Sequence, residues 1–153
     1  MKYRYLLIDN DNTLMDFHAA EHAALREALT EAGIEPTDAV CARYSAINDA
    51  LWKALERGET THAALKITRF AQLLEEYPAE NVCAPRLALR YSHYLGTHAD
   101  LMPGAEALLR RLHGQMKIVL VSNGDSVIQR NRLFRSVFTP LLDNIVKKKK
   151  KGV

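Results

Sequence analysis

The chain has 153 residues, of which 48% are hydrophobic and 25% are charged, and its net charge is +3. This length suits one domain, or one small domain with an insertion, and the composition excludes disorder along most of the chain. Five consecutive lysines at 147–151 supply the positive charge, because removing five charges from +3 leaves −2. The mildly acidic remainder argues against a specific nucleic-acid partner, and the lysine block is interpreted as a solvated tail.

The sequence shows no pattern typical of membrane insertion or secretion. No apolar stretch approaches the length of a bilayer span, and the N-terminus has no long apolar segment before a small-residue cleavage site. The two cysteines, Cys41 and Cys83, lie far apart without metal-type spacing and are interpreted as reduced thiols. We therefore expect a cytoplasmic protein without a membrane partner.

The first predicted element is a strand over residues 3–9, an apolar run typical of a parallel strand that is covered on both faces. The strand ends at Asp9, and a second acid follows at Asp11. Residues 10–17 are expected to form a loop. From about 16 to 98 the apolar residues keep helical spacing, which predicts four helices and no strand. The breaks between these helices fall at Gly33, Gly58 and Pro78.

Strands and helices alternate again after residue 98. The expected elements are a turn at 101–104, a helix at 105–112, a strand at 116–121, a helix at 125–136 and a strand from Asn144. This order predicts an α/β fold, an incomplete Rossmann-like parallel sheet with an inserted α-helical cap subdomain. The expected core comprises residues 1–15 and 99–153, and the expected cap comprises residues 16–98.

Polar residues follow two of the predicted strands at their carboxyl ends. They are Asp9, Asp11 and Thr13 after the first strand, and Ser122, Asn123 and Gly124 after the second. In open parallel sheets ligands bind at this edge. A carboxylate there can attack phosphorus if a cation such as Mg²⁺ screens the repulsion, and a second acid can move the proton. Hydroxyl and backbone N–H groups can hold the phosphoryl oxygens. The alternative interpretation of the two acids is an acid-rich turn.

These motifs resemble those of the haloacid dehalogenase-like hydrolases, in the branch with a helical cap inserted after strand one. Within it the chain is most similar to the pyrimidine 5′-nucleotidase group. The first family motif, D-x-D-x-T after an apolar strand, matches Asp9, Asp11 and Thr13, and the second matches Ser122 at a strand end. Further similarity to the nucleotidase group lies in residues 46–52 and 55–59, and in Gly124, Gln129, Arg132 and Leu133.

The resemblance implies a role for each matched residue. Asp9 would be the nucleophile and a Mg²⁺ ligand, and Asp11 would be the acid/base and give the metal its backbone carbonyl. The phosphate-binding residues would be Ser122, Asn123, Gly124 and Thr13. In the cap, Asn48 and Trp52 could line the base pocket, although Trp52 suits the cap core equally well. The acid at Asp11 favours phosphoryl transfer over dehalogenation, because dehalogenases of this superfamily lack an acid at that position.

The family's third and fourth motifs, a lysine and an acidic pair, belong after the third strand, where this sequence has only residues 147–153. We therefore expect a C-terminally truncated product whose first strand is an exposed apolar edge that would allow oligomerisation. The expected function is a Mg²⁺-dependent phosphomonoester hydrolase, a 5′-nucleotidase that acts on a nucleoside monophosphate through an aspartyl-phosphate. The alternative is an inactive remnant that binds phosphate or a partner without turnover.

Overall fold

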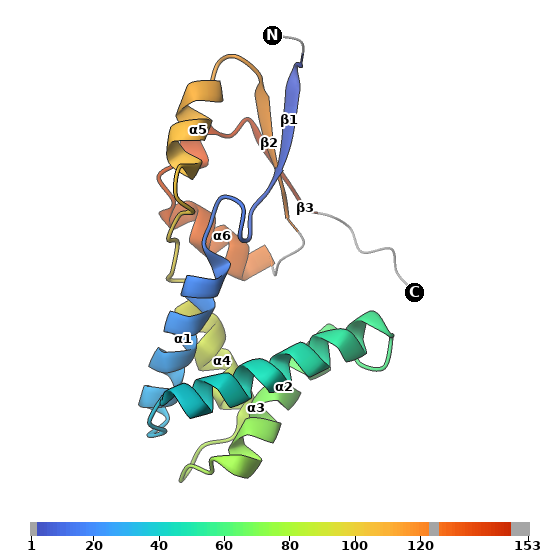
Figure 1. Ribbon diagram of the computed structural model, residues 1–153, viewed down its shortest axis with the longest axis vertical. Helices are drawn as coiled ribbons and strands as arrows, with labels where there is room; N and C mark the ends of the chain where they lie inside the picture. Colours follow the sequence, from blue (N-terminus) through green and yellow to red (C-terminus); the bar gives the residue numbers. More distant parts are fainter. Residues whose placement is uncertain (1–2, 123–125, 148–153) are drawn as a thin grey trace. The chain divides into compact units, whose positions relative to one another are not determined.

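The computed structural model describes residues 3–122 and 126–147. Its elements in chain order are β1 (Tyr5–Asp9), α1 (Phe17–Glu31), α2 (Asp38–Glu56), α3 (His62–Glu76), α4 (Ala84–Leu95), α5 (Ala105–Leu112), β2 (Lys117–Ser122), α6 (Ser126–Arg135), the 3₁₀ turn η1 (Thr139–Leu141) and β3 (Asn144–Lys147) (Figure 1). Within these ranges no helix combines the length and hydropathy that crossing a bilayer requires. The mixture of helices with a parallel sheet confirms the predicted α/β class.

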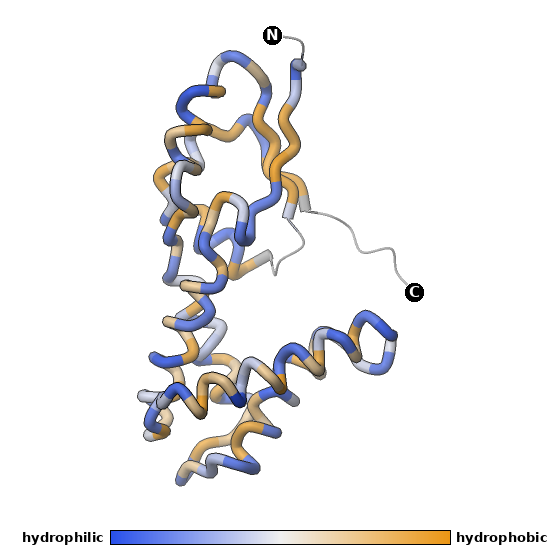
Figure 2. Tube along the Cα trace, viewed as in Figure 1, coloured by the Kyte–Doolittle hydropathy of each residue, from blue (hydrophilic) through white to orange (hydrophobic). Residues whose placement is uncertain are grey.

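The three strands form one parallel sheet in the order β1-β2-β3. Tyr5 lies opposite Lys117 at one end of the first strand pair, and Asp9 lies opposite Val121 at the other. Figure 2 shows the apolar stretches of β1 and β2 side by side. Because all three strands run in the same direction, their carboxyl ends share one edge of the sheet.

Only one face of this sheet is covered by the described residues. The core on this face contains apolar side chains of β1, β2, α5 and α6, namely Leu6, Ile8, Ile118, Leu120, Leu109 and Leu133. On the other face, Tyr5 and Leu7 are 67% and 69% exposed. The predicted covering of β1 on both faces is therefore not seen. The predicted exposed apolar edge at β1 is seen.

The breaks between α1, α2, α3 and α4 lie at the predicted residues, Gly33, Gly58 and Pro78. Thr37 and Thr61 cap α2 and α3, and their hydroxyl oxygens accept hydrogen bonds from the backbone N–H groups of Val40 and Ala64. Gly33 and Gly58 follow helix ends with φ of +76° and +75°, a conformation that glycine adopts without strain. These local signals divide the chain into separate helices before any packing is considered.

The chain divides into two compact units, residues 1–21 with 96–153 and residues 22–95. The first unit contains the sheet with α5 and α6, and the second contains α2, α3 and α4. The second unit has an aromatic core of Tyr44, Phe70 and Tyr91, whose ring centroids lie 5.3 to 6.0 Å apart. The domain limits predicted from the sequence, 1–15 with 99–153 and 16–98, stay predictions.

Candidate active site

A tight loop follows β1 and carries Asp11. The backbone carbonyl of Asn10 accepts hydrogen bonds from the N–H groups of residues 13–15, at 2.9 to 3.2 Å. Asn12 has φ of +58°, in the left-handed region that asparagine tolerates better than most residues. Its side-chain oxygen accepts hydrogen bonds from the first two N–H groups of α1 at 3.0 and 3.2 Å. These bonds fasten the loop both to the end of the strand and to the start of α1.

The two candidate acids differ in how their carboxylates are held. Asp9 is exposed at the end of β1, and its carboxylate makes no hydrogen bond or ion pair within the described part of the chain. The Asp11 side chain is 28% exposed, and both of its oxygens accept hydrogen bonds. Arg132 donates to Oδ1 and Gln129 donates to Oδ2, each at 2.7 Å. Asp9 is therefore available to a ligand, while Asp11 is fixed in one position.

The second acid and three side chains around it form one connected set, here named the Asp11 network: Asn10, Asp11, Gln129 and Arg132. The side-chain oxygen of Gln129 accepts from Asn10 Nδ2 at 2.7 Å, while its nitrogen donates to Asp11. Arg132 is fully buried, and its Nε donates to the backbone carbonyl of His98 at 3.0 Å. A buried guanidinium is costly unless it is paired and hydrogen-bonded, and Asp11 supplies the opposite charge.

The predicted phosphate-binding residues are only partly within the described chain. Ser122 ends β2 at the same sheet edge as Asp9, which lies opposite the residue before Ser122. The Ser122 side chain is buried, and Thr13 is exposed in the loop after β1. Asn123 and Gly124 lie outside the described residues. The structure therefore places Ser122 at the end of the strand next to the one that carries Asp9 and leaves the predicted phosphate contacts as predictions.

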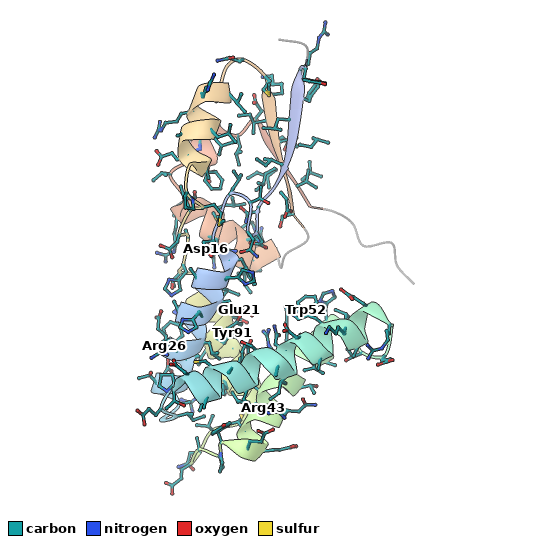
Figure 3. The ribbon with its side chains drawn as sticks, viewed as in Figure 1. Asp16, Glu21, Arg26, Arg43, Trp52 and Tyr91 are labelled. Atoms are coloured by element: carbon teal, nitrogen blue, oxygen red, sulfur yellow. The ribbon has the colours of Figure 1, made fainter. Side chains whose placement is uncertain are left out.

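The two predicted cap residues, Asn48 and Trp52, lie one turn apart on α2. Figure 3 labels Trp52 on this helix. Asn48 is buried, and its side-chain oxygen accepts a hydrogen bond from Arg69 at 3.1 Å. Trp52 is 42% exposed, and its ring meets that of His62 edge-on with centroids 5.4 Å apart. Asn48 is thus tied into the interior of the helical unit while Trp52 keeps an open face. Their roles in binding a base stay predictions.

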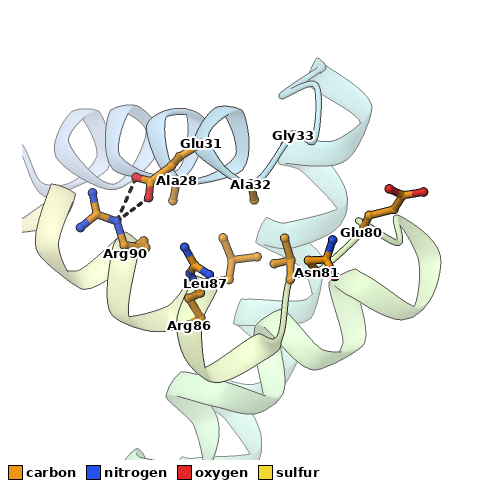
Figure 4. Close-up of a pocket in the computed structure, with 10 residues that line it drawn as sticks. Ala28, Glu31, Ala32, Gly33, Glu80, Asn81, Arg86, Leu87 and Arg90 are labelled. Atoms are coloured by element: carbon orange, nitrogen blue, oxygen red, sulfur yellow. Dashed lines mark hydrogen bonds and ion pairs between the residues drawn. The ribbon is translucent and has the colours of Figure 1, made fainter.

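A separate hollow of about 330 Å³ lies between α1 and α4 (Figure 4). Its lining includes Glu31 and Arg90, which form an ion pair at 2.8 Å. Hydrogen bonds from Arg90 and Tyr94 hold the pKa of Glu31 below its usual value. The hollow contains no residue of the Asp11 network and lies wholly within residues 22–95. It is therefore distinct from the strand-end acids.

A sequence model of the haloacid dehalogenase-like hydrolases matches residues 3–151. The chain belongs to this family. It is 38% identical to a Bacillus subtilis protein named as a HAD-hydrolase, YfnB, over 94% of this chain and 61% of that protein. It is 36% identical to the pyrimidine 5′-nucleotidase PynA of Streptococcus pneumoniae, over 95% of this chain and 61% of that protein. The chain thus spans about three fifths of the length of these curated relatives.

Solved structures of the haloacid dehalogenase-like fold agree with this assignment. The crystal structure of YfnB, described as bound to magnesium, superposes with a TM-score of 0.89 at 37% identity, over 96% of this chain and 64% of that one. A Thermotoga maritima protein described as a β-phosphoglucomutase superposes with a TM-score of 0.72 at 16% identity, over 98% of this chain and 64% of that one. The second likeness shows the fold alone.

The strand-end residues of this chain fit a Mg²⁺ ion in the chemistry of their donors. Mg²⁺ binds oxygen and needs only one or two protein carboxylates, since it keeps several waters. The Asp9 carboxylate and the backbone carbonyl of Asp11 accept no hydrogen bond from the described residues, so both are available as ligands. Within those residues, however, no cluster of three or more histidine, cysteine or acidic side chains is placed to hold a metal. Asp9 and Asp11 could therefore supply part of the set of oxygen ligands that a Mg²⁺ ion needs.

Three members of the Asp11 network were not predicted as site residues: Asn10, Gln129 and Arg132. Gln129 and Arg132 lie three residues apart on α6, a spacing that places both on one face of a helix. That spacing, together with their similarity to the nucleotidase group, is the signal for these two residues in the sequence. Asn10 gave no such signal, because an asparagine between two acids is also typical of a simple turn.

Proposed function

We propose that this hydrolase is a Mg²⁺-dependent phosphomonoesterase, a 5′-nucleotidase that hydrolyses nucleoside 5′-monophosphates. The observation that carries the proposal is the pair of acids after β1, one with a free carboxylate and one held in place. Two relatives named as pyrimidine 5′-nucleotidases, PynA at 36% identity and YjjG of Escherichia coli at 28%, support the substrate class. An acid at Asp11 also separates this chain from the dehalogenases, which cleave a bond whose leaving group needs no proton.

The chemistry of the proposal runs in two steps. A carboxylate oxygen of Asp9 attacks phosphorus and forms an aspartyl-phosphate, while the ester oxygen leaves with a proton from Asp11. Asp11, now a carboxylate, takes a proton from a water that attacks the phosphorus, which releases phosphate and restores Asp9. Bound Mg²⁺ would screen the repulsion between the Asp9 carboxylate and the phosphate. Ser122 is placed at the strand end where a hydroxyl could donate to a phosphoryl oxygen.

The test is phosphate release from dUMP, UMP and dTMP by the purified chain, with Mg²⁺ and with Mg²⁺ removed by a chelator. We expect turnover with Mg²⁺ and loss of most of it without the ion. A matched reaction with a nucleoside in place of the nucleotide sets the background. If no nucleotide releases phosphate in a Mg²⁺-dependent way, the chain has the family's fold without the proposed activity.

The exposed strand β1 supports self-association as a further part of the proposal. Tyr3, Tyr5 and Leu7 are 68%, 67% and 69% exposed, and β1 lies at the edge of the sheet. Such an edge presents unpaired backbone groups and apolar side chains to another strand. We expect the weight-average mass in sedimentation equilibrium to rise with concentration, and Leu7→Lys to suppress this rise. Leu89→Lys, equally exposed on α4, is the control. A monomer at every concentration would contradict this part.

A further inference from the structure

The hydrogen bonds around Asp11 are more specific than an ion pair alone requires. A salt bridge needs one cation, whereas this carboxylate has separate donors for its two oxygens, Arg132 on Oδ1 and Gln129 on Oδ2. Asn10 Nδ2 also donates to Oδ1, at 3.4 Å. A carboxylate has about four lone-pair sites, so these three donors leave one site for a proton. The arrangement therefore fixes both oxygens and still permits proton transfer.

Gln129 can hold Asp11 in only one orientation of its own amide. Its oxygen accepts from Asn10 and its nitrogen donates to Asp11, both at 2.7 Å. Turning the amide over would bring its oxygen against a carboxylate oxygen and its nitrogen against the Asn10 amino group. Asn10 is itself fully buried and its backbone carbonyl closes the loop after β1. Gln129 thus connects the position of the carboxylate to the end of the strand that carries Asp9.

Three features restrain the Arg132 side chain in addition to its bond to Asp11. Its Nε donates to the carbonyl of His98, its Cζ lies 5.5 Å from the centroid of the Phe17 ring, and its side chain is fully buried. A guanidinium that packs on a ring face and donates hydrogen bonds from Nε and Nη1 has little freedom to move. The Nη1 donor therefore presents a fixed point to Asp11 Oδ1.

From these contacts we infer that Gln129 and Arg132 are positioning residues that hold the Asp11 carboxylate where it exchanges a proton with the leaving oxygen. The inference rests on the proposed function and adds two residues of α6 to it. It explains why two polar side chains, Gln129 and Arg132, are buried on one face of a short surface helix. It also predicts which substrates depend on them, because only a poor leaving group needs the proton from Asp11.

The experiment compares kcat/KM for two phosphate esters in the full chain. With dUMP the leaving alkoxide needs a proton, whereas with p-nitrophenyl phosphate the phenolate leaves without one. Since kcat/KM reports steps only up to departure of the leaving group, the later use of Asp11 as a base does not enter. Gln129→Met keeps the side-chain length and removes both hydrogen bonds. We expect it to lower kcat/KM for dUMP roughly 100-fold, and for p-nitrophenyl phosphate less than about threefold.

Arg132→Met should show the same selective loss, and Arg132→Lys should restore part of it because one charged donor remains. The matched controls are Gln115→Met and Arg135→Met, exposed residues outside the Asp11 network, which should leave both esters unchanged. Equal losses for the two esters would show a merely structural role and overturn the inference while the proposed function stands. A wild-type chain that releases phosphate from neither ester would overturn both, since no reaction would remain for these residues to assist.

Discussion

Replacing Asp9 with asparagine is expected to abolish nucleotide hydrolysis, with a loss of more than about 10⁴-fold in kcat. The neutral amide is a poor nucleophile and cannot form the aspartyl-phosphate. The fold should be unaffected, because Asp9 is exposed and its carboxylate has no hydrogen-bond or ion-pair partner among the described residues. Phosphate release and the urea unfolding midpoint of the same preparation measure the two effects together.

A second variant at the same site separates the nucleophile from the acid/base. Asp11→Asn keeps the nucleophile, so its loss in kcat should be smaller, on the order of 10²- to 10⁴-fold. It should also lower stability, since the fully buried Arg132 loses its charged partner. Asp16→Asn is the matched control, because an asparagine can still accept the hydrogen bond that Asp16 Oδ1 takes from the Ala19 N–H. If the Asp9→Asn variant of the first prediction kept its turnover, the nucleophile would have to be another residue.

The fold was predictable wherever the signal is local. Gly33, Gly58 and Pro78 marked the breaks between the helices, because left-handed turns and proline breaks depend on a few adjacent residues. The alternation of strands with helices after residue 98 predicted the parallel sheet. The covering of β1 was not predictable in this way, since an apolar strand shows which side chains avoid water but not whether a second layer is there to pack on them.

The candidate site was predictable in its residue types and only partly in its contacts. Asp9 and Asp11 could be predicted because they lie at the end of an apolar strand, a position that a sequence shows directly. The partners of Asp11 lie 118 and 121 residues away along the chain, so their contact depends on how α6 packs beside the sheet. Polar residues on a short helix usually face solvent, and the helical spacing that Gln129 shares with Arg132 does not by itself show that their face is buried while Arg135 is exposed.

The helical unit offers the largest expected effect on stability, at Phe70. This side chain is fully buried on α3, and its ring centroid lies 5.3 Å from that of Tyr44 and 5.4 Å from that of Tyr91. The guanidinium of Arg69 lies 5.3 Å from the same ring and gains from its π face. Phe70→Ala removes these contacts and leaves a cavity between α2, α3 and α4. We expect the free energy of unfolding to fall by about 3–5 kcal/mol.

The control for this variant is Phe134→Ala, which is the same substitution at a residue that is 90% exposed on α6. It should alter the free energy of unfolding by no more than about 0.5 kcal/mol. Urea unfolding followed by far-UV circular dichroism gives both values, and amide hydrogen exchange shows where protection is lost. Because residues 22–95 form a compact unit of their own, Phe70→Ala should expose their amides before those of β1 and β2. Equal effects of the two phenylalanines would mean that the aromatic core does not form in solution.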